Sequence, residues 1–297
     1  MNALFFTGAL IATFAGSHIL HAQELEQPVK TNKTPRSVIS AGAFGGIQTL
    51  TYQLTNKGVR SIGLSGGGGV GYAFHITRTL SVSAGAELSN YTASLVYNAL
   101  SNQVYRNGGV RFNYSITEYW ESQTALWLDV PILIRLTVPT GVGRHAIRFA
   151  GGVKFGLPAN LQYTWSVKGH KTLSAILDYE SMEYDFNAIF PPNTAAALPE
   201  QTGRLLLNTS IQLAAEVTYC LPVFAQSALS LSAYFSYGLN NIQNPKKKQL
   251  VTYSTADADL RNKPPQYTYN GSILNTAFAS SIRTFALGLK LQLEWGL

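Results

Sequence analysis

Charged residues, cysteines and long apolar runs are all scarce in this chain of 297 residues. Only 12% of its residues are charged, compared with roughly 25% in an ordinary soluble domain, although 46% are hydrophobic. No apolar run of about 18 residues or more follows the N-terminal segment, which excludes membrane-spanning helices. The hydrophobic residues are plentiful but dispersed, so we expect a structure in which apolar and polar positions alternate.

Cysteine is nearly absent, because Cys220 is the single cysteine. One cysteine excludes an intramolecular disulfide and a cysteine-based metal cluster. The formal net charge is +7, but the basic residues are spread along the chain instead of forming one patch, so we expect no nucleic-acid partner. The glycine run 66–69 is not followed by the helical pattern that a phosphate-binding loop requires, and we expect no cofactor and no metal.

Alternation of apolar and polar residues is clearest from 126 to 138. One face of this segment is entirely apolar and consists of Leu126, Leu128, Val130, Ile132, Ile134, Leu136 and Val138. The other face consists of Trp127, Asp129, Pro131, Leu133, Arg135 and Thr137. An apolar face opposite a face that holds charge and bulk is typical of a membrane barrel, whose outside meets lipid and whose interior is polar.

The same alternation predicts eight strands. They cover 37–52, 63–76, 80–95, 126–138, 145–158, 205–221, 228–239 and a last segment that ends at residue 297. The connections alternate between short ones (77–79, 139–144, 222–227) and long ones (96–122, 168–204, 240–280). Bacterial barrels have short periplasmic turns and long external loops. We therefore predict an all-β, transmembrane, up-and-down antiparallel β-barrel of eight strands, with both termini in the periplasm.

The N-terminal region is typical of an exported protein. Residues 1–22 contain an apolar stretch from Ala3 to Ala15 and end in Leu20-His21-Ala22, as in a secretory signal peptide. We expect a flexible periplasmic segment at 23–36 and the outer-membrane barrel with its long extracellular loops at 37–297. No second domain is expected.

The interior of an eight-stranded barrel is just wide enough for side chains to fill it, so we expect a filled lumen. Eight charged residues fall on the inward face, four of each sign, and are the candidate lumen charge network: Glu87, Asp129, Arg135, Arg148, Lys154, Glu216, Lys290 and Glu294. An unpaired ion in a packed interior costs several kcal/mol, so these residues should form ion pairs. The network is either a structural plug or a functional site.

The register of the two strands around the 139–144 connection can also be predicted. A turn centred between Gly141 and Val142 would place Asp129 opposite Lys154 and Arg135 opposite Arg148. The second pair would then need a carboxylate from the next strand, such as Glu216.

Aromatic residues near strand ends suggest two interfacial girdles. The outward members are Phe74, Tyr219 and Trp295 on the turn side and Tyr163, Trp165 and Tyr237 on the loop side. The connection 96–122 holds further rings, and its binding candidates are Tyr105, Tyr114, Tyr119 and Trp120. These rings form a binding surface, or they pack the loop onto the rim or extend its strands above the membrane.

Two charged loop segments have alternative interpretations. Asp178, Glu180, Glu183 and Asp185 lack a regular calcium-binding pattern, which favours a solvated acidic loop over a metal site. The lysines at 246–248 are either solvated or in contact with lipopolysaccharide phosphates.

Catalysis at the outer rim would need a histidine near a serine or near paired acids. Outside the signal segment the histidines are His75, His145 and His170, and only His170 is predicted on the outer side, with no nucleophile placed beside it. We therefore expect no enzyme. A lipid-modifying enzyme or protease, and a narrow channel for small solutes, are the alternatives.

The stretch from Leu128 to Arg135 resembles a segment of the PorT-like outer-membrane β-barrel family of Bacteroidetes, matching at Leu128, at Pro131 and in the apolar run, with an acid at Asp129 and a base at Arg135. The residues at 149–152, Phe-Ala-Gly-Gly, are similar to that family's aromatic-Ala-Gly strand. The motif covers about two strands, and the layout covers nearly the whole mature chain. The resemblance implies an outer-membrane barrel, often without an assigned activity, and carries over no catalytic residue.

Together these patterns predict an outer-membrane protein with a structural or surface-interaction role, through binding, adhesion or accessory work in envelope assembly. Its expected partners are outer-membrane lipid and lipopolysaccharide. The long loops leave room for a protein partner in the envelope or outside the cell.

Overall fold

The structure is a computed structural model of the whole chain. It describes residues 37–55, 58–107, 110–140, 145–167, 171–179, 182–185, 198–224, 226–254, 266–269 and 271–297, and it gives only the backbone of those that fall within 101–115, 117, 171–200 and 251–269. The expected signal peptide and periplasmic segment, residues 1–36, lie outside the described residues. No helix in these described ranges is both long and apolar enough to cross a membrane.

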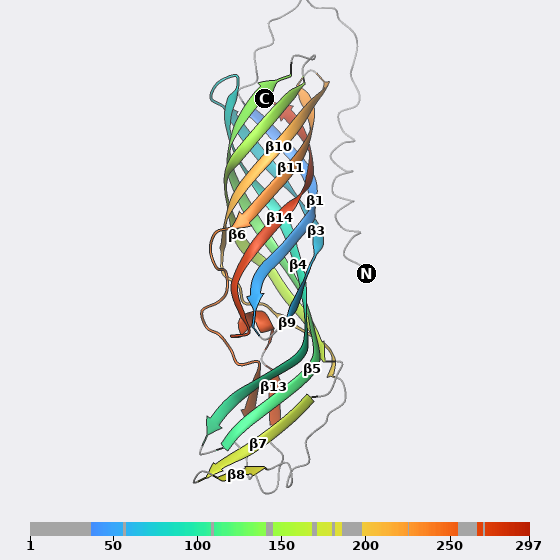
Figure 1. Cartoon of the computed structure of the whole chain (residues 1–297). Helices are drawn as coiled ribbons and strands as arrows, with labels where there is room; N and C mark the ends of the chain where they lie inside the picture. The colour runs from blue at the N-terminus through green and yellow to red at the C-terminus, as the bar shows by residue number, and fades with distance from the viewer. Residues whose placement is uncertain are drawn as a thin grey trace, which may run out of the picture. The chain divides into compact units, whose positions relative to one another are not determined.

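Eight long strands form a closed antiparallel ring (Figure 1). They are β1 (Ser37–Leu54), β3 (Leu64–His75), β4 (Leu80–Asn107), β5 (Val110–Pro139), β6 (Ala146–Val167), β10 (Ser210–Phe224), β11 (Ser227–Gly238) and β14 (Ala279–Gly296). Each strand pairs with the next of the eight, and β14 pairs with β1. The predicted all-β, up-and-down barrel of eight strands is confirmed.

The two faces of β5 have the predicted environments. Leu128, Ile132, Ile134, Leu136 and Val138 are 36–61% exposed on the outside of the ring. Their inward neighbours from Trp127 to Arg135 are buried, while Thr137 is half-buried near the turn. Because successive side chains of a strand point to opposite faces, the alternation in sequence sorts residues into outside and lumen.

Exposed apolar side chains surround the ring, and we call them the apolar belt. Its large members are Ile39, Leu64, Val70, Tyr72, Phe74, Val82, Leu88, Leu128, Ile132, Ile134, Leu136, Val138, Phe149, Phe155, Leu157, Ile211, Leu213, Val217, Tyr219, Leu231, Phe235, Leu287, Leu289, Leu291, Leu293 and Trp295. No charged residue occupies an outward position between them on the eight described strands. Towards the long connections the outward positions become polar, with Asn90 and Thr92 on β4 and Ser122 and Thr124 on β5.

Much of the predicted loop 96–122 is strand, which corrects that boundary. β4 and β5 continue beyond the apolar belt as one hairpin, paired from Leu80↔Leu136 to Asn107↔Val110. The sequence prediction ended too early because it followed hydrophobic alternation, and beyond the belt the outward positions of both strands are no longer apolar.

Short strands extend the ring on the side of the long connections (Figure 1). β2 (Val59–Ile62) pairs with β4, β7 (Lys171–Tyr179) with β5, β8 (Met182–Asp185) with β7, and β9 (Leu198–Arg204) with β6. β12 (Val251–Ser254) and β13 (Gln266–Tyr269) form a separate ribbon. The connections predicted as loops 168–204 and 240–280 therefore contain strands as well.

A β-bulge in β6 points two aromatic side chains into the barrel, although both were predicted to lie on its outside. The pairing with β5 changes from Trp127↔Pro158 to Leu126↔Asn160, which leaves one extra residue in β6. One extra residue moves every later side chain to the other face. Tyr163 and Trp165 are therefore buried, and their placement in an outer girdle was wrong.

The other predicted girdle residues lie outside. Phe74, Tyr219 and Trp295 are exposed near the short turns, and Tyr237 is half-buried towards the long connections. The Tyr219 hydroxyl lies 3.1 Å from Nδ1 of His145, and the two rings stack.

The end of the barrel near the long connections is closed by its own hydrophobic core. The 3₁₀ helix η2 (Ile273–Asn275) inserts Ile273 and Leu274, and the same connection adds Ile242, Leu250 and Phe278. These side chains pack with buried rings of the barrel wall: Tyr52, Tyr97, Tyr119, Tyr163 and Trp165.

Candidate functional site

All eight residues of the predicted lumen charge network point into the barrel. Seven are buried, and the Arg148 side chain is 12% exposed. Their positions follow from strand parity, because each lies on the face opposite the apolar belt. The structure divides them into two ion-paired groups, one carboxylate held by neutral donors and one unpaired cation.

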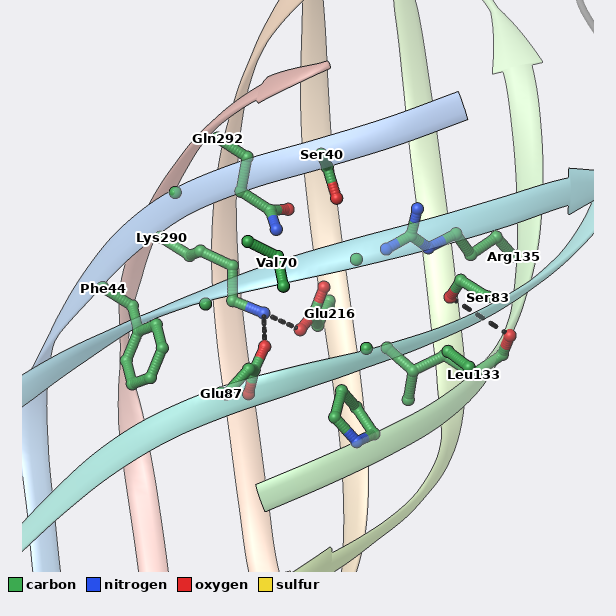
Figure 2. Close-up of a pocket in the computed structure, with 16 residues that line it drawn as sticks. Ser40, Phe44, Val70, Ser83, Glu87, Leu133, Arg135, Glu216, Lys290 and Gln292 are labelled. Carbon is green, nitrogen blue, oxygen red and sulfur yellow. Dashed lines mark hydrogen bonds and ion pairs between the residues drawn. The ribbon is translucent and has the colours of Figure 1, made fainter. Parts of the chain in front are cut away.

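The central group contains two lysines and two glutamates. Glu87 on β4 binds Lys154 at 2.6 Å and Lys290 at 2.8 Å, and Lys290 also contacts Glu216. Figure 2 shows the Lys290 ammonium between the two carboxylates. The ring of Phe44 lies within 5.9 Å of both ammonium groups. The group is electrically neutral, as a buried set of charges must be to limit its desolvation cost.

A second ion pair lies nearer the short turns. The Arg148 guanidinium donates to Glu294 through two hydrogen bonds, of 2.6 Å and 3.0 Å. Such bidentate geometry is the strongest form of a carboxylate pair.

The predicted register around the 139–144 connection was wrong by two residues. Lys154 lies opposite Pro131 and Arg148 opposite Thr137, whereas Asp129 faces Gly156. A shift of two residues changes the partners but not the faces, because side chains alternate with a period of two.

Asp129 therefore has a different environment from the one predicted. Its carboxylate accepts hydrogen bonds from the Tyr91 hydroxyl and the Gln212 amide, each at 3.3 Å. It forms no ion pair with any residue whose side chain is described. The predicted pair with Lys154 is replaced by the contact between Lys154 and Glu87.

Arg135 is the exception among the cations. It is 8% exposed and forms neither a hydrogen bond nor an ion pair with another described side chain. Its predicted neighbour Arg148 faces Thr137 instead, and the carboxylate expected to serve it, Glu216, binds Lys290. Arg135 lines a lumen cavity of about 20 Å³ together with Ser40, Ser83 and Gln292 (Figure 2).

A buried carboxylate that the sequence did not single out lies at the other end of the barrel. Glu121 on β5 is fully buried and accepts hydrogen bonds from Tyr119 Oη at 2.7 Å, Gln123 Nε2 at 2.9 Å, the backbone N–H of Ile273 at 2.9 Å and the Ser272 hydroxyl. It thereby ties η2 to the barrel wall. This part of β5 lies beyond the apolar belt, and burial raises the pKa of Glu121 above its ordinary value.

Glu121 was missed because residues 96–122 were assigned to a loop. Its parity is that of Asp129, so continuing the strand by a few residues would have placed it in the lumen. The same boundary affected Tyr119, which was named as a loop binding candidate, with packing on the rim or extension of the strands as the alternative; the alternative is what the structure has. Tyr119 is buried, and its ring stacks on Trp165 at 6.0 Å between centroids.

The remaining loop candidates are placed as follows. Trp120 is half-buried and points outward. Tyr105 belongs to β4 and Tyr114 to β5, and at these two positions only the backbone is described. The lysines 246–248 are exposed. The acidic side chains at 178, 180, 183 and 185, and His170, lie outside what the structure describes.

Among the side chains that the structure describes, no group of three or more His, Cys, Asp or Glu is arranged to hold a metal ion. The lumen carboxylates are instead engaged by lysine, arginine and neutral donors. The arrangement of the described lumen is thus suited to holding the walls together.

No protein-family model matches the chain, and no curated protein matches it. Among solved structures, the chain is similar to the crystal structure of the outer membrane protease OmpT from Escherichia coli, with a TM-score of 0.28 and 9% sequence identity over 92% of this chain and 99% of that chain.

Proposed function

We propose that this protein is an outer-membrane β-barrel with a structural or surface-interaction role in the cell envelope. The observation that supports this most directly is the apolar belt around a closed ring of strands. On β5 the outward face is apolar from Leu126 to Val138, and about 9 to 11 tilted strand residues suffice to cross a hydrocarbon layer. A soluble protein would have to hydrate this surface, whereas lipid acyl chains cover it without cost in hydrogen bonds.

The contacts inside the barrel favour the interpretation of a sealed barrel over that of a transporter. Ion pairs cross the lumen between Glu87, Lys154, Lys290 and Glu216, and η2 packs into the end near the long connections. The cavity beside Arg135 has room for about one water-sized molecule. No observation on the described residues favours the alternative of a narrow channel.

The enzyme alternative likewise gains no support from a specific contact. His145 engages Tyr219 at the belt's turn side, and the described lumen carboxylates are held by lysine, arginine, tyrosine and glutamine. We propose a non-catalytic role, in which the hairpin of β4 and β5 and the segments paired with it present a surface outside the cell.

The proposed partners are outer-membrane lipid and lipopolysaccharide. The belt would contact acyl chains, and the exposed lysines 246–248 would meet the phosphates at the outer surface. A protein partner bound by the extended hairpin is also part of the proposal. Membership of the PorT-like family stays a prediction.

Thiol labelling in intact cells tests location and orientation together. A cysteine at Asn244 should react with a membrane-impermeant maleimide, whereas one at Thr140 should react only after the outer membrane is permeabilised. The native Cys220 is buried, so background labelling should be small. The reverse pattern would contradict the orientation, and equal labelling at both sites in intact cells would contradict insertion in the membrane.

A further inference from the structure

We propose that the lumen cavity beside Arg135 binds a small monovalent anion of the size of chloride. Arg135 reaches into this cavity from β5, while Ser40 on β1 and Gln292 on β14 enter it from across the ring (Figure 2). The inference is independent of the proposed function, since it concerns only the interior of the barrel.

The first argument is that Arg135 has no bonded counter-ion among the described residues. Lys154 and Lys290 share Glu87, Lys290 also holds Glu216, and Arg148 holds Glu294 through two hydrogen bonds. Glu216 and Glu294 influence Arg135 only through space. A guanidinium has five N–H donors and stays charged at all ordinary pH values, so in this largely buried position it favours an acceptor within the cavity that it lines.

The second argument is that Asp129 cannot compensate for Arg135. The two residues are six positions apart on the same strand, about 20 Å at the usual strand rise. Asp129 is moreover engaged by Tyr91 and Gln212. The lumen is neutral in total, but one positive charge is left over locally at Arg135.

The third argument is the chemistry of the cavity wall. Besides Arg135, the wall has the hydroxyls of Ser40 and Ser83 and the side-chain amide of Gln292, all of which are able to donate hydrogen bonds. Ser83 makes only a long bond, of 3.4 Å, to the carbonyl of Leu133. The two carboxylates at the opposite end of the cavity are bound to Lys290. Donors and a free positive charge favour an anion over a cation.

Glycines in the wall create the space. A Cβ atom at Gly71 would lie 2.8 Å from Oγ of Ser40, and one at Gly69 would lie 2.8 Å from Cγ of Glu87. The resulting volume of about 20 Å³ admits one water-sized particle. Chloride and bromide are monatomic anions and are closer in size to water than sulfate, phosphate and organic carboxylates, which are too large.

Anion-dependent stability tests the site. The melting temperature of the purified barrel in detergent is measured while chloride is replaced by gluconate at constant ionic strength. Binding to the folded state alone raises stability in a saturable way, so we expect the melting temperature of the wild type to rise with chloride or bromide and to level off. Arg135→Gln should lose this dependence. Arg78→Gln, which removes an exposed base in a turn, should keep it.

Crystals of the wild-type protein grown with bromide provide a second measurement that does not depend on the folding of a variant. We expect an anomalous bromide peak within hydrogen-bond distance of the Arg135 guanidinium. A water molecule alone at that position, or a direct ion pair of Arg135 with Glu216 or Glu294, would overturn the proposal. So would an equal chloride response in wild type and Arg135→Gln, or a bromide peak without any halide-dependent melting temperature.

Discussion

At the scale of single residues, the lumen charges differ in what holds them. Glu87 bridges two ammonium groups, whereas Asp129 contacts neutral donors only. Removing one member of a buried ion pair leaves an uncompensated charge, which costs far more than the pair itself contributes. The environment of each carboxylate therefore decides the effect of its removal, although all lie in the same barrel interior.

A double-mutant cycle in the central group follows from this difference. Glu87→Gln should lower the free energy of unfolding by about 3 to 5 kcal/mol, because Lys154 loses its carboxylate partner. Lys154→Met should restore part of that loss, since the unpaired ammonium is gone. Urea unfolding in lipid vesicles measures both effects. Asp129 lies near Lys154 without bonding to it, so Asp129→Asn should show a smaller coupling with Lys154→Met than Glu87→Gln does. Additive losses for Glu87→Gln with Lys154→Met would reject the bridge.

Glu121 has a pH dependence whose sign can be worked out. Burial raises its pKa in the folded state above the ordinary value of 4.5, so the folded protein binds its proton more tightly than the unfolded chain does. Its contribution to stability is then fully present below pH 4.5 and is lost as the pH rises through the folded-state pKa.

Glu121→Gln should remove this slope from a plot of unfolding free energy against pH. The slope amounts to at most about 1.4 kcal/mol per pH unit for one titrating group. Thr124→Ala, at an exposed position on the same strand without a titratable group, should keep this slope. Identical pH profiles for the wild type and Glu121→Gln would show that Glu121 does not titrate differently in the two states.

At the scale of elements, each strand is defined by its two faces and by the height of the apolar belt. β5 shows both, since its outward face changes from polar Ser122 and Thr124 to apolar residues from Leu126 onward. Its inward face continues without a break from Trp127 through Gln123 and Glu121. The strand is therefore longer than its apolar outward face.

Arginine substitutions on the outward face of β5 test where the belt ends. Ile132→Arg should cost roughly 2 to 4 kcal/mol, as a cation facing lipid near the midplane does, whereas Thr124→Arg should cost about 0 to 1 kcal/mol. Both side chains are exposed on the same strand, so the comparison isolates depth. Folding into lipid vesicles measures the difference. Equal losses at the two positions would contradict the proposed membrane level.

At the scale of the whole barrel, closure of the ring and filling of its lumen belong together. The interior of eight strands is only wide enough for side chains. Here the central ion pairs occupy the middle, and Ile273 and Leu274 close one end.

Planar-bilayer recordings should therefore show no large, stable conductance. The physical reason is that an ion would have to break the Glu87 bridge or displace η2 to pass. A water-filled porin recorded under the same conditions serves as the positive control. Stable large openings of the reconstituted wild-type protein would contradict the sealed lumen.

The sequence alone determined the features that depend on a period of two. It gave eight strands, an apolar outside, and an inward position for residues such as Glu87 and Lys290, because the face of a strand residue follows from its parity. Only the tertiary structure decided the partners: Lys154 binds Glu87 and not Asp129, and Arg135 has no bonded carboxylate among the described residues. Pairing depends on the register at the turn and on closure of the ring between strands far apart in sequence.

The bulge in β6 and the extension of β4 and β5 were also revealed only by the tertiary structure. One extra residue reverses the parity on which the placement of Tyr163 and Trp165 rested. Pro158 lies beside it, and a proline inside a strand is compatible with a bulge, but the residue type alone does not show that the parity changes there. Beyond the belt, alternation of hydrophobicity ends although the strands continue, because outward positions such as Ser122 and Thr124 are polar there. The sequence thus shows which face of a strand a residue occupies, whereas register, bulges and ion pairing arise from contacts between distant segments.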